Sequence, residues 1–293
     1  MKNSLLRTVR NYLSLVKFSH TVFAMPFALI GFSLAVWGNE NIFSLKLLLL
    51  IILCMIFARN AAMGFNRVAD NRIDAINPRT KDRELPSGRI SKKAAMVFVT
   101  LNAVLFIVTA GFINRLTLYL APVALLVILG YSLTKRFTYL CHFILGLGLS
   151  LAPIGAYISV TGSFAILPVI YSLIVITWVS GFDIIYALQD EEFDRSNRLH
   201  SLPSAAGRKK ALIISIAVHT VTFLLVIIAG YLAKGGILFW IGAFIFTSLL
   251  IYQHSIVKHD DLRKVTLAFG TTNGIASILF AVFVILDLWI RSA

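Results

Sequence analysis

Charged residues are scarce in this 293-residue chain. Asp, Glu, Lys and Arg together make up 14% of the positions, whereas hydrophobic residues make up 58%. A water-soluble protein of this length needs far more charge to cover its surface, so the composition excludes an ordinary soluble domain.

Cysteine is scarcer still. Cys54 and Cys141 both fall in or near apolar stretches, which indicates buried thiols and no disulfide framework.

Several common catalytic motifs are also absent from the sequence. It contains no HExxH or CxxC pair of metal ligands, no GxSxG nucleophile turn, no Walker phosphate loop and no GxGxxG fingerprint. The sequence therefore gives no sign of a zinc protease, an α/β-hydrolase, a P-loop NTPase or a dinucleotide-binding enzyme.

Long apolar stretches, by contrast, are abundant. A helix needs about 20 residues to cross a hydrocarbon core of roughly 30 Å. The first apolar stretch follows a basic segment but lacks the small-residue cleavage site of a signal peptide, so we expect it to be retained. We predict an all-α polytopic membrane protein with about nine transmembrane helices, at 21–37, 43–65, 94–113, 116–133, 140–160, 165–189, 211–233, 236–256 and 266–290.

The charges that are present are mostly basic and unevenly placed. The formal net charge is +14, from 27 Lys and Arg against 13 Asp and Glu. If the N-terminus is cytoplasmic, Lys46, Arg115, Lys234 and Arg291 are external, Arg59 lies within a span, and the other 22 basic residues face the cytoplasm. This asymmetry follows the positive-inside rule and predicts a multi-pass protein with its N-terminus inside and its C-terminus outside. The membrane we expect is the bacterial cytoplasmic membrane. The basic excess thus indicates topology, with attraction to anionic lipid or an anionic substrate, and no nucleic-acid binding.

The long polar connections all lie on the predicted cytoplasmic side, at about 66–93 and 190–210. We expect a single transmembrane domain over residues 1–293 with these two loops as its cap. The stretch 77–89 mixes turn formers with cations, which suits either a lid that closes over an anion or a merely solvated basic loop.

The first of these loops is preceded by three oxygen-bearing side chains at four-residue spacing. Asn66, Asp70 and Asp74 fall within about 80° of one another on a helix, and so on one face. Two bare carboxylates one turn apart would repel each other. A hard divalent cation relieves this repulsion, and Mg²⁺ takes oxygen ligands while sharing substrate phosphates. The spacing therefore predicts a Mg²⁺ ligand set.

A second triplet repeats this spacing 120 positions later. Tyr186, Asp190 and Asp194 also close an apolar stretch and open a basic loop, with Asp183 upstream of them. The repetition suggests a duplicated half. Inserting an Asp into a bilayer costs roughly 2.5–3.5 kcal/mol at a helix centre. Five of the nine Asp residues of the chain lie in these two segments, so their placement calls for a functional explanation.

The alternative is that the acidic residues are solvated helix ends. In that case they would pair with Arg67, Arg72 and Arg195. A single Asp pair would not distinguish the two interpretations. Two clusters with matched spacing on one membrane face favour the metal site.

Basic residues at other helix ends fit an anionic ligand. Tyr131 and Lys135 are one turn apart at the end of the fourth span, where Lys135 suits a phosphate oxygen and Arg136 could clamp a phosphate or carboxylate. These residues could equally be positive-inside anchors. Lys17, at the entry to the first span, could be an interfacial residue that keeps its charge in water.

Together these motifs resemble the UbiA superfamily of intramembrane prenyltransferases. The resemblance spans nearly the whole chain, and the combination of motifs, not any one of them, makes it specific. It implies a nine-helix bundle with a central cavity under a cytoplasmic cap. It also implies transfer of a polyprenyl group from its diphosphate to an aromatic acceptor. The motifs are Asn66, Asp70 and Asp74, the 79–88 loop, Tyr131, Lys135 and Arg136, and Asp183, Tyr186, Asp190 and Asp194.

The resemblance also implies roles for these residues. Two Mg²⁺ ions would bridge the diphosphate, one held by the first triplet and one by Asp190 and Asp194. The apolar cavity would hold the prenyl tail and keep water from the carbocation. The remaining roles are assistance to the leaving group by Lys135, Arg72 and Tyr131, binding of diphosphate or acceptor by Tyr186, orientation or deprotonation of the acceptor by Asp183, and binding of its carboxylate by Arg136 or Lys17.

Within the superfamily, the sequence looks like the 4-hydroxybenzoate polyprenyltransferase branch in ubiquinone biosynthesis. It is most similar to the subgroup linked to futalosine-pathway menaquinone synthesis, whose acceptor is 1,4-dihydroxy-6-naphthoate. The stretches 17–26, 135–142 and 181–193 carry this finer match. Cys141-His142 stands where typical hydroxybenzoate enzymes have Pro-Gln, and Ser19-His20 where they have a Pro-containing pair, so the acceptor stays open.

Two other functions remain as alternatives. A cation-coupled transporter would also pair Asp residues, but near the midplane and beside broken helices. A lipid-diphosphate transferase with a non-aromatic lipid acceptor would use the same diphosphate site. Incubating membranes with labelled polyprenyl diphosphate and candidate acceptors would distinguish all three, because a transporter would form no product.

Overall fold

The computed structural model describes residues 10–16, 23–37 and 43–292. Within them every regular element is helical, which confirms the predicted all-α class. Eight helices are long and apolar enough to cross a membrane, and α2 is a shorter apolar helix beside them. The elements are α2 Met25–Trp37, α3 Leu45–Ile76, α4 Lys92–Gly111, α5 Arg115–Thr134, α6 Cys141–Thr161, α7 Ile166–Ala187, η2 Leu188–Asp190, α8 Glu191–Ser196, α9 Leu202–Leu232, α10 Ile237–Ile256, η3 Leu267–Thr272 and α11 Asn273–Ser292.

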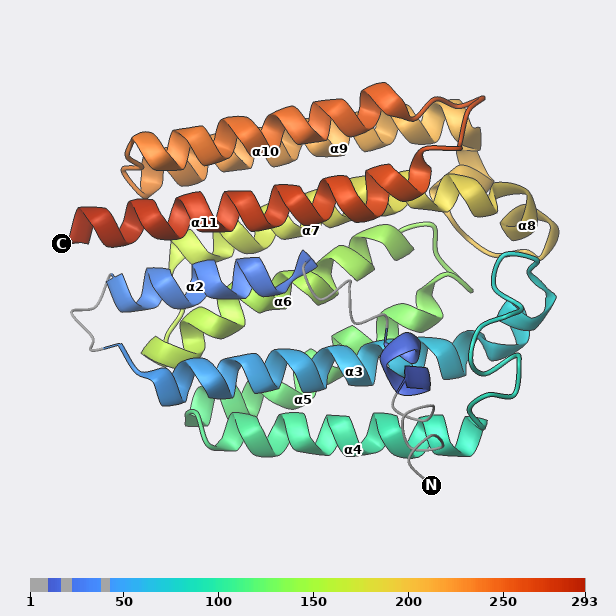
Figure 1. Ribbon diagram of the computed structural model, residues 1–293, viewed down its shortest axis with the longest axis horizontal. Helices are drawn as coiled ribbons and strands as arrows, with labels where there is room; N and C mark the ends of the chain where they lie inside the picture. The colour runs from blue at the N-terminus through green and yellow to red at the C-terminus, as the bar shows by residue number, and fades with distance from the viewer. Residues whose placement is uncertain (1–9, 17–22, 38–42, 293) are drawn as a thin grey trace.

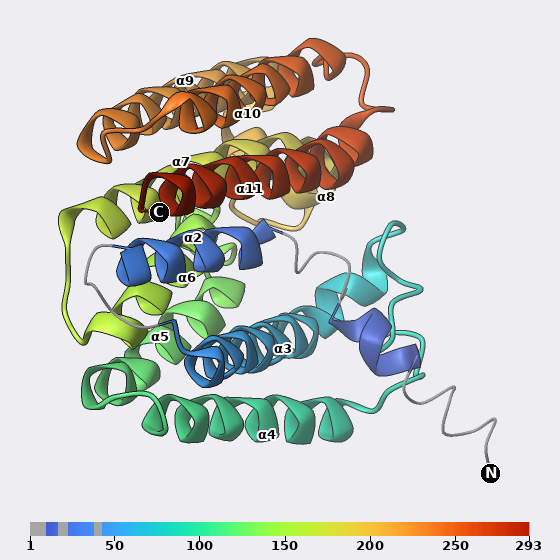
Figure 2. The same ribbon diagram turned by 60° about the vertical axis from the view of Figure 1, so that its left-hand side comes forward.

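The long helices lie alongside one another in a bundle (Figures 1 and 2). Helices α3, α4 and α5 form one side of it, and α9, α10 and α11 form the other. Helices α2, α6 and α7 pack between these sides, with extensive contacts of α6 on both α2 and α7. The connection after α3 and the short helix α8 lie at the same end of the bundle.

Hydrogen-bonding side chains mark where several helices begin. The hydroxyls of Ser44 and Ser91 and the amide oxygen of Asn114 accept from backbone N–H groups in the first turns of α3, α4 and α5. Ser201 and Ser204 form a reciprocal capping box at the start of α9. These caps satisfy donors that a helix end leaves unpaired, so they fix the helix starts at the membrane surface.

The central helices approach one another very closely. A Cβ at Gly31 of α2 would lie 2.0 Å from the carbonyl oxygen of Pro153 in α6, and one at Gly146 of α6 would lie 2.5 Å from that of Ile176 in α7. Only glycine permits these distances, as is common where membrane helices pack. The contacts hold α2, α6 and α7 as one rigid wall.

Three predicted boundaries need correction. Helix α3 continues to Ile76, so the predicted loop at 66–93 begins with more than two turns of helix and is irregular only from Asn77 to Ser91. Likewise, α8 and the start of α9 occupy most of the predicted loop at 190–210. The ninth span, predicted at 266–290, begins as a π-helical turn at Leu267–Thr272.

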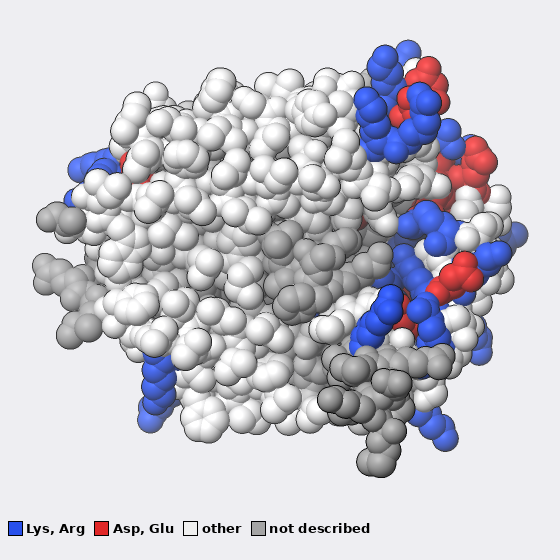
Figure 3. All heavy atoms as spheres, in the orientation of Figure 1, with Lys and Arg blue, Asp and Glu red and all other residues white. Residues whose placement is uncertain are grey.

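On the face shown in Figure 3, most charged side chains gather at one end, a few lie toward the other end, and the stretch between them is almost free of charge. The charged end carries the connection after α3 and helix α8. This distribution is that of a membrane-spanning bundle with one elaborated polar end. The orientation of this end toward the cytoplasm stays a prediction from the positive-inside rule.

Candidate functional site

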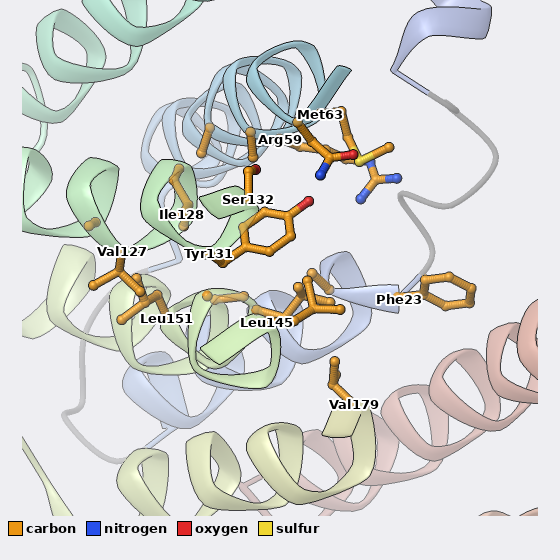
Figure 4. Close-up of a pocket in the computed structure, with 18 of the residues that line it drawn as sticks. Phe23, Arg59, Met63, Val127, Ile128, Tyr131, Ser132, Leu145, Leu151 and Val179 are labelled. Atoms are coloured by element: carbon orange, nitrogen blue, oxygen red, sulfur yellow. The ribbon is translucent and has the colours of Figure 1, made fainter. Parts of the chain in front are cut away.

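A large cavity opens at the charged end and extends between α3, α5, α6 and α7, with Phe23 and Ala24, just before α2, also in its wall. Its volume is about 600 Å³, and most of its lining is apolar. Figure 4 shows part of its wall, where the Tyr131 and Arg59 side chains lie among Met63, Leu145 and Val179. The cavity reaches side chains close to the opposite ends of α5 and α6, so it follows much of the length of the bundle.

A smaller polar recess of about 90 Å³ adjoins the mouth of this cavity. Three of the predicted acidic ligands that line it are Asp74 of α3, Asp190 of η2 and Asp194 of α8. The chain thus brings the two triplets, 120 positions apart, to one place. Five residues line both spaces and form the passage between them: Asp70, Arg79, Arg83, Lys135 and Asp190.

The first triplet lies along the last turns of α3, and both of its carboxylates are paired with cations. Asn66 Nδ2 donates to Asp70 at 3.1 Å, and Arg136 donates to the other Asp70 oxygen at 3.1 Å. Arg83 Nη1 contacts both oxygens of Asp74, at 2.8 and 3.0 Å. The predicted single helix face is therefore present, with cations from two other segments facing it.

The second triplet does not lie on one continuous α-helix. The chain tightens into a 3₁₀ turn at Leu188–Asp190 between α7 and α8, which changes the angular relation of Tyr186 to Asp194. Asp190 accepts two hydrogen bonds from Arg79 and one from Asn77 at 3.3 Å. The equal sequence spacing therefore gives one helix face in the first triplet and three different elements in the second.

Asp194 is the most deeply placed acidic side chain of the site. It is fully buried, with Lys135 Nζ at 2.8 Å from one oxygen and Ser201 Oγ donating to the other at 2.8 Å. Burial lowers the pKa of Lys135, but attraction to Asp194 outweighs this effect and raises the pKa above its usual value. The ammonium therefore stays charged. His200 also donates its backbone N–H to the Lys135 carbonyl at 2.7 Å, which fixes this turn against the second loop.

Arg79, in the loop that follows α3, contacts the end of α7. Its Nη1 donates to the Tyr186 hydroxyl at 2.8 Å, and its guanidinium lies 5.2 Å from the centre of the Tyr186 ring. Although burial acts against the charge, the hydrogen bonds to Asp190 and Tyr186 raise the pKa of Arg79 further above its already high value. This residue thus orders the loop over the site.

The donor set fits a hard divalent cation combined with an anionic ligand. Four carboxylates line the recess, the Asn66 amide lies on the cavity side next to Asp70, and oxygen is the ligand atom that Mg²⁺ prefers. Among the described residues, no three His, Cys, Asp or Glu side chains form a ready metal cage. The carboxylates instead face four cations, Arg79, Arg83, Lys135 and Arg136, so an incoming phosphate would supply oxygens that both the metal and these cations can bind.

Two predicted site residues are not placed at the site. Arg72 is exposed and lines neither space, because two residues from Asp70 along a helix is a rotation of about 200°, toward the opposite face. Lys17 lies outside the described residues. Arg72 and Arg67 also make no ion pair with the site carboxylates, and Arg195 pairs with Glu191 instead, at 2.7 Å. The partners expected for solvated helix ends are therefore not the ones found.

The sequence interpretation missed three features of the site. The acid-pairing roles of Arg79 and Arg83 were hidden in the predicted lid. Arg59, a charged residue within a predicted span, lines the apolar cavity and was not assigned a role. His142, left open as an unusual residue, lies with Nδ1 at 2.6 Å from Asp183. Only Arg59 carried a visible signal, because a charge in a membrane span is itself a functional hint.

Comparison with known proteins agrees with this architecture. The UbiA prenyltransferase family matches residues 24–285. The 4-hydroxybenzoate octaprenyltransferase of Aliivibrio fischeri is 30% identical over 235 residues, covering 80% of this chain and 81% of that protein. The protein of the same name from Vesicomyosocius okutanii is 29% identical over 260 residues, covering 86% and 94% of the two chains.

Solved structures show the same fold. The apo structure of a UbiA homolog from Aeropyrum pernix K1 has a TM-score of 0.80 and 27% identity, covering 94% of this chain and 98% of that one. A UbiA homolog from Archaeoglobus fulgidus bound to GPP and Mg²⁺ has a TM-score of 0.73 at 20% identity, covering 95% and 99%. The long family match and these full-length similarities establish that the chain is a member of the UbiA prenyltransferase family.

Proposed function

We propose that this protein transfers a polyprenyl group from polyprenyl diphosphate to an aromatic acid, with Mg²⁺ as its cofactor. The observation that carries the proposal is the junction of a polar recess, lined by carboxylates and cations, with a long apolar cavity. A polyprenyl diphosphate has the same division into an anionic head and an apolar tail. The whole chain, 1–293, would form one membrane domain whose polar end faces the cytoplasm of a bacterial cell.

The metal-binding proposal uses both triplets. Asn66, Asp70 and Asp74 would hold one Mg²⁺, and Asp190 and Asp194 a second. The ions would neutralise the charge that develops on the leaving diphosphate. The Archaeoglobus fulgidus homolog is described as bound to GPP or DMAPP together with Mg²⁺, which supports this assignment.

The basic residues of the recess would bind the diphosphate. Arg79, Arg83, Lys135 and Arg136 each contact one site carboxylate, and phosphate oxygens would give them equivalent partners once the carboxylates take up metal. Tyr131, at the cavity wall, would lie beside the leaving group. Breaking the allylic C–O bond leaves its electron pair on the diphosphate oxygen, and these cations stabilise that charge.

The acceptor would occupy the cavity next to the recess. Asp183 lines the cavity and would orient the acceptor hydroxyl or take its proton. Arg59 lines it as well and would bind the acceptor carboxylate, since a guanidinium and a carboxylate form two parallel hydrogen bonds. The sequence predicts Arg136 or Lys17 for this role, but Arg136 contacts Asp70 and the Ala69 carbonyl, and Lys17 lies outside the described residues.

The curated relatives support an aromatic acid as acceptor, because their names specify 4-hydroxybenzoate. Within that class we propose a dihydroxynaphthoate of menaquinone synthesis, on the strength of the three finer sequence stretches. The decisive test offers membranes containing the protein labelled polyprenyl diphosphate, Mg²⁺ and either 4-hydroxybenzoate or 1,4-dihydroxy-6-naphthoate. Mass analysis should detect the prenylated naphthoate.

The other outcomes of this test are equally informative. Turnover of the benzoate alone overturns the naphthoate preference while leaving aromatic prenyl transfer intact. A product formed only with a lipid glycerol identifies a non-aromatic acceptor. A protein that forms no prenylated product but moves a cation across vesicles is a transporter, and that result refutes the proposed function.

A further inference from the structure

His142, in the first turn of α6, is held by hydrogen bonds on both ring nitrogens. Nδ1 lies 2.6 Å from Asp183 Oδ2 on α7, and Nε2 lies 3.3 Å from the backbone nitrogen of Leu202, the first residue of α9. Both residues line the cavity, but the His142 side chain is only 2% exposed whereas the Asp183 side chain is 21% exposed. The aspartate is therefore the more accessible of the two to a ligand in the cavity.

These contacts determine the tautomer of the ring. A backbone N–H can only donate, so the Leu202 amide requires an unprotonated Nε2. The remaining ring proton is then on Nδ1 and is donated to Asp183. A donor at this distance stabilises the ionised carboxylate of Asp183, and among the described residues the other Asp183 oxygen accepts no hydrogen bond.

The backbone around His142 is rigid. Ser180 Oγ donates to the His142 carbonyl oxygen at 3.2 Å, which joins α6 to α7. A Cβ at Gly146, one turn further along α6, would lie 2.9 Å from that same Ser180 oxygen. The separation of His142 and Asp183 is thus set by the close packing of two helices and not by free side-chain rotation.

The same histidine connects Asp183 with the metal side of the site. Leu202 follows Ser201, and the Ser201 hydroxyl donates to Asp194 at 2.8 Å. The start of α9 therefore holds His142 with its first backbone amide and Asp194 with its capping side chain. The start of α9 thus helps to position both Asp183, which lines the cavity, and Asp194, which lies in the recess.

We propose that His142 is a positioning residue that holds the ionised Asp183 carboxylate ready to accept the proton of the acceptor hydroxyl. This inference rests on the proposed function. In the step concerned, the acceptor O–H bond breaks, the proton moves to an Asp183 oxygen and the electron pair stays on the acceptor oxygen. That electron density activates the ring carbon that bonds to the prenyl C1, while the diphosphate leaves with the C–O electron pair. The C–H bond at that carbon then breaks and its electron pair restores the aromatic ring, while Asp183 returns its proton to the acceptor oxygen. The proton from carbon passes to the leaving diphosphate or to water, so one proton is released in each turnover.

The test compares His142→Phe, which keeps the volume but removes both hydrogen bonds, with His142→Asn, whose amide nitrogen can replace Nδ1 as donor. We expect His142→Phe to lower kcat about 10- to 100-fold, the range of one hydrogen bond to a charged group, with an unchanged KM for polyprenyl diphosphate. His142→Asn should recover most of this loss. The loss in His142→Phe should also shrink for a fluorinated acceptor whose hydroxyl is more acidic.

A double-mutant cycle with Asp183→Asn separates positioning from a merely structural role. If His142 acts through Asp183, adding His142→Phe to Asp183→Asn costs little further activity. Additive losses, an effect confined to the KM for polyprenyl diphosphate, or equal losses for acidic and ordinary acceptors would each overturn the inference.

The wild-type protein is measured in parallel as the reference. If it prenylates no aromatic acid, the proposed function fails and this inference fails with it; if it does so while the cycle is additive, only the inference fails. Should the Phe variant not fold, the Asn variant decides, because a loss of kcat there as large as in Asp183→Asn contradicts the proposal.

Discussion

Replacing Arg59 by Met would test the acceptor site most directly. Arg59 lies in the middle of α3, seven residues before Asn66, and so about 10 Å further from the charged end along the helix axis. Its side chain is half-buried in the cavity wall beside Met63 and Tyr131 (Figure 4). Methionine keeps the length and apolar contacts of the Arg59 stem while removing the charge.

The expected effect follows from the surroundings of Arg59. A hydrogen bond to a charged group contributes about 1.5–3 kcal/mol, and the apolar lining offers little competing water. Since 1.4 kcal/mol corresponds to a factor of ten, the KM for an aromatic acid should rise about 10- to 100-fold. The KM for polyprenyl diphosphate should stay unchanged because Arg59 lines the cavity and not the recess.

The assay measures prenyl transfer to an aromatic acid and to the matching phenol without its carboxylate. Arg59→Met should lose activity with the acid and little with the phenol, whereas Arg59→Lys, which keeps the charge but not the paired donors, should fall between. A loss of the same size for both acceptors would refute the carboxylate role and assign Arg59 to the fold or to the prenyl diphosphate.

Further predictions concern the recess. Asp70→Ala and Asp190→Ala should each lower Mg²⁺-dependent transfer at least about 100-fold, while Asp261→Ala, in an exposed pair with Arg263, leaves it unchanged; near-normal turnover of both site variants would refute the two-metal assignment. Removal of divalent cations with EDTA should abolish transfer, and added Mg²⁺ should restore it. In calorimetry, Mg²⁺ and a non-hydrolysable prenyl diphosphate analogue should each raise the protein's affinity for the other by the same factor. Independent binding of the two would contradict the proposal that the carboxylates release their basic partners to phosphate when they bind metal. Ser201→Ala should lower stability by about 2 kcal/mol, measured as a lower thermal midpoint in detergent, because it removes a helix cap and a partner of buried Asp194.

Much of the fold follows from short-range patterns in the sequence. Apolar stretches of membrane length predicted the bundle, and the four-residue spacing in 66–74 placed its oxygens on one face of α3. These features depend on helix geometry alone. The prediction failed where the chain leaves the regular α-helix: the 3₁₀ turn at Leu188–Asp190 has no strong local marker, so equal spacing there did not give an equal face.

The ion pairs of the site depend on tertiary contacts and could not be predicted. Arg79 lies 111 positions from Asp190, and no local pattern marks it among the basic residues of the loop as the partner of that carboxylate. The contact of His142 with Asp183 depends on how closely α6 and α7 pack, which sequence spacing does not encode. The position of Arg72, by contrast, follows from helix geometry alone. Residues two apart on a helix face nearly opposite directions, so Arg72 points away from the site that Asp70 faces.

The pairing of each of the four recess carboxylates with a cation explains how so much charge is tolerated at a membrane surface. Four Asp side chains face four basic ones, so the recess carries almost no net charge before substrate binds. Burying unpaired carboxylates would be costly. A divalent cation alone would displace the basic residues without giving them new partners, and a diphosphate alone would face the carboxylates. Together they let carboxylates bind metal while arginine and lysine bind phosphate, so the recess favours the complete metal–diphosphate ligand over either part.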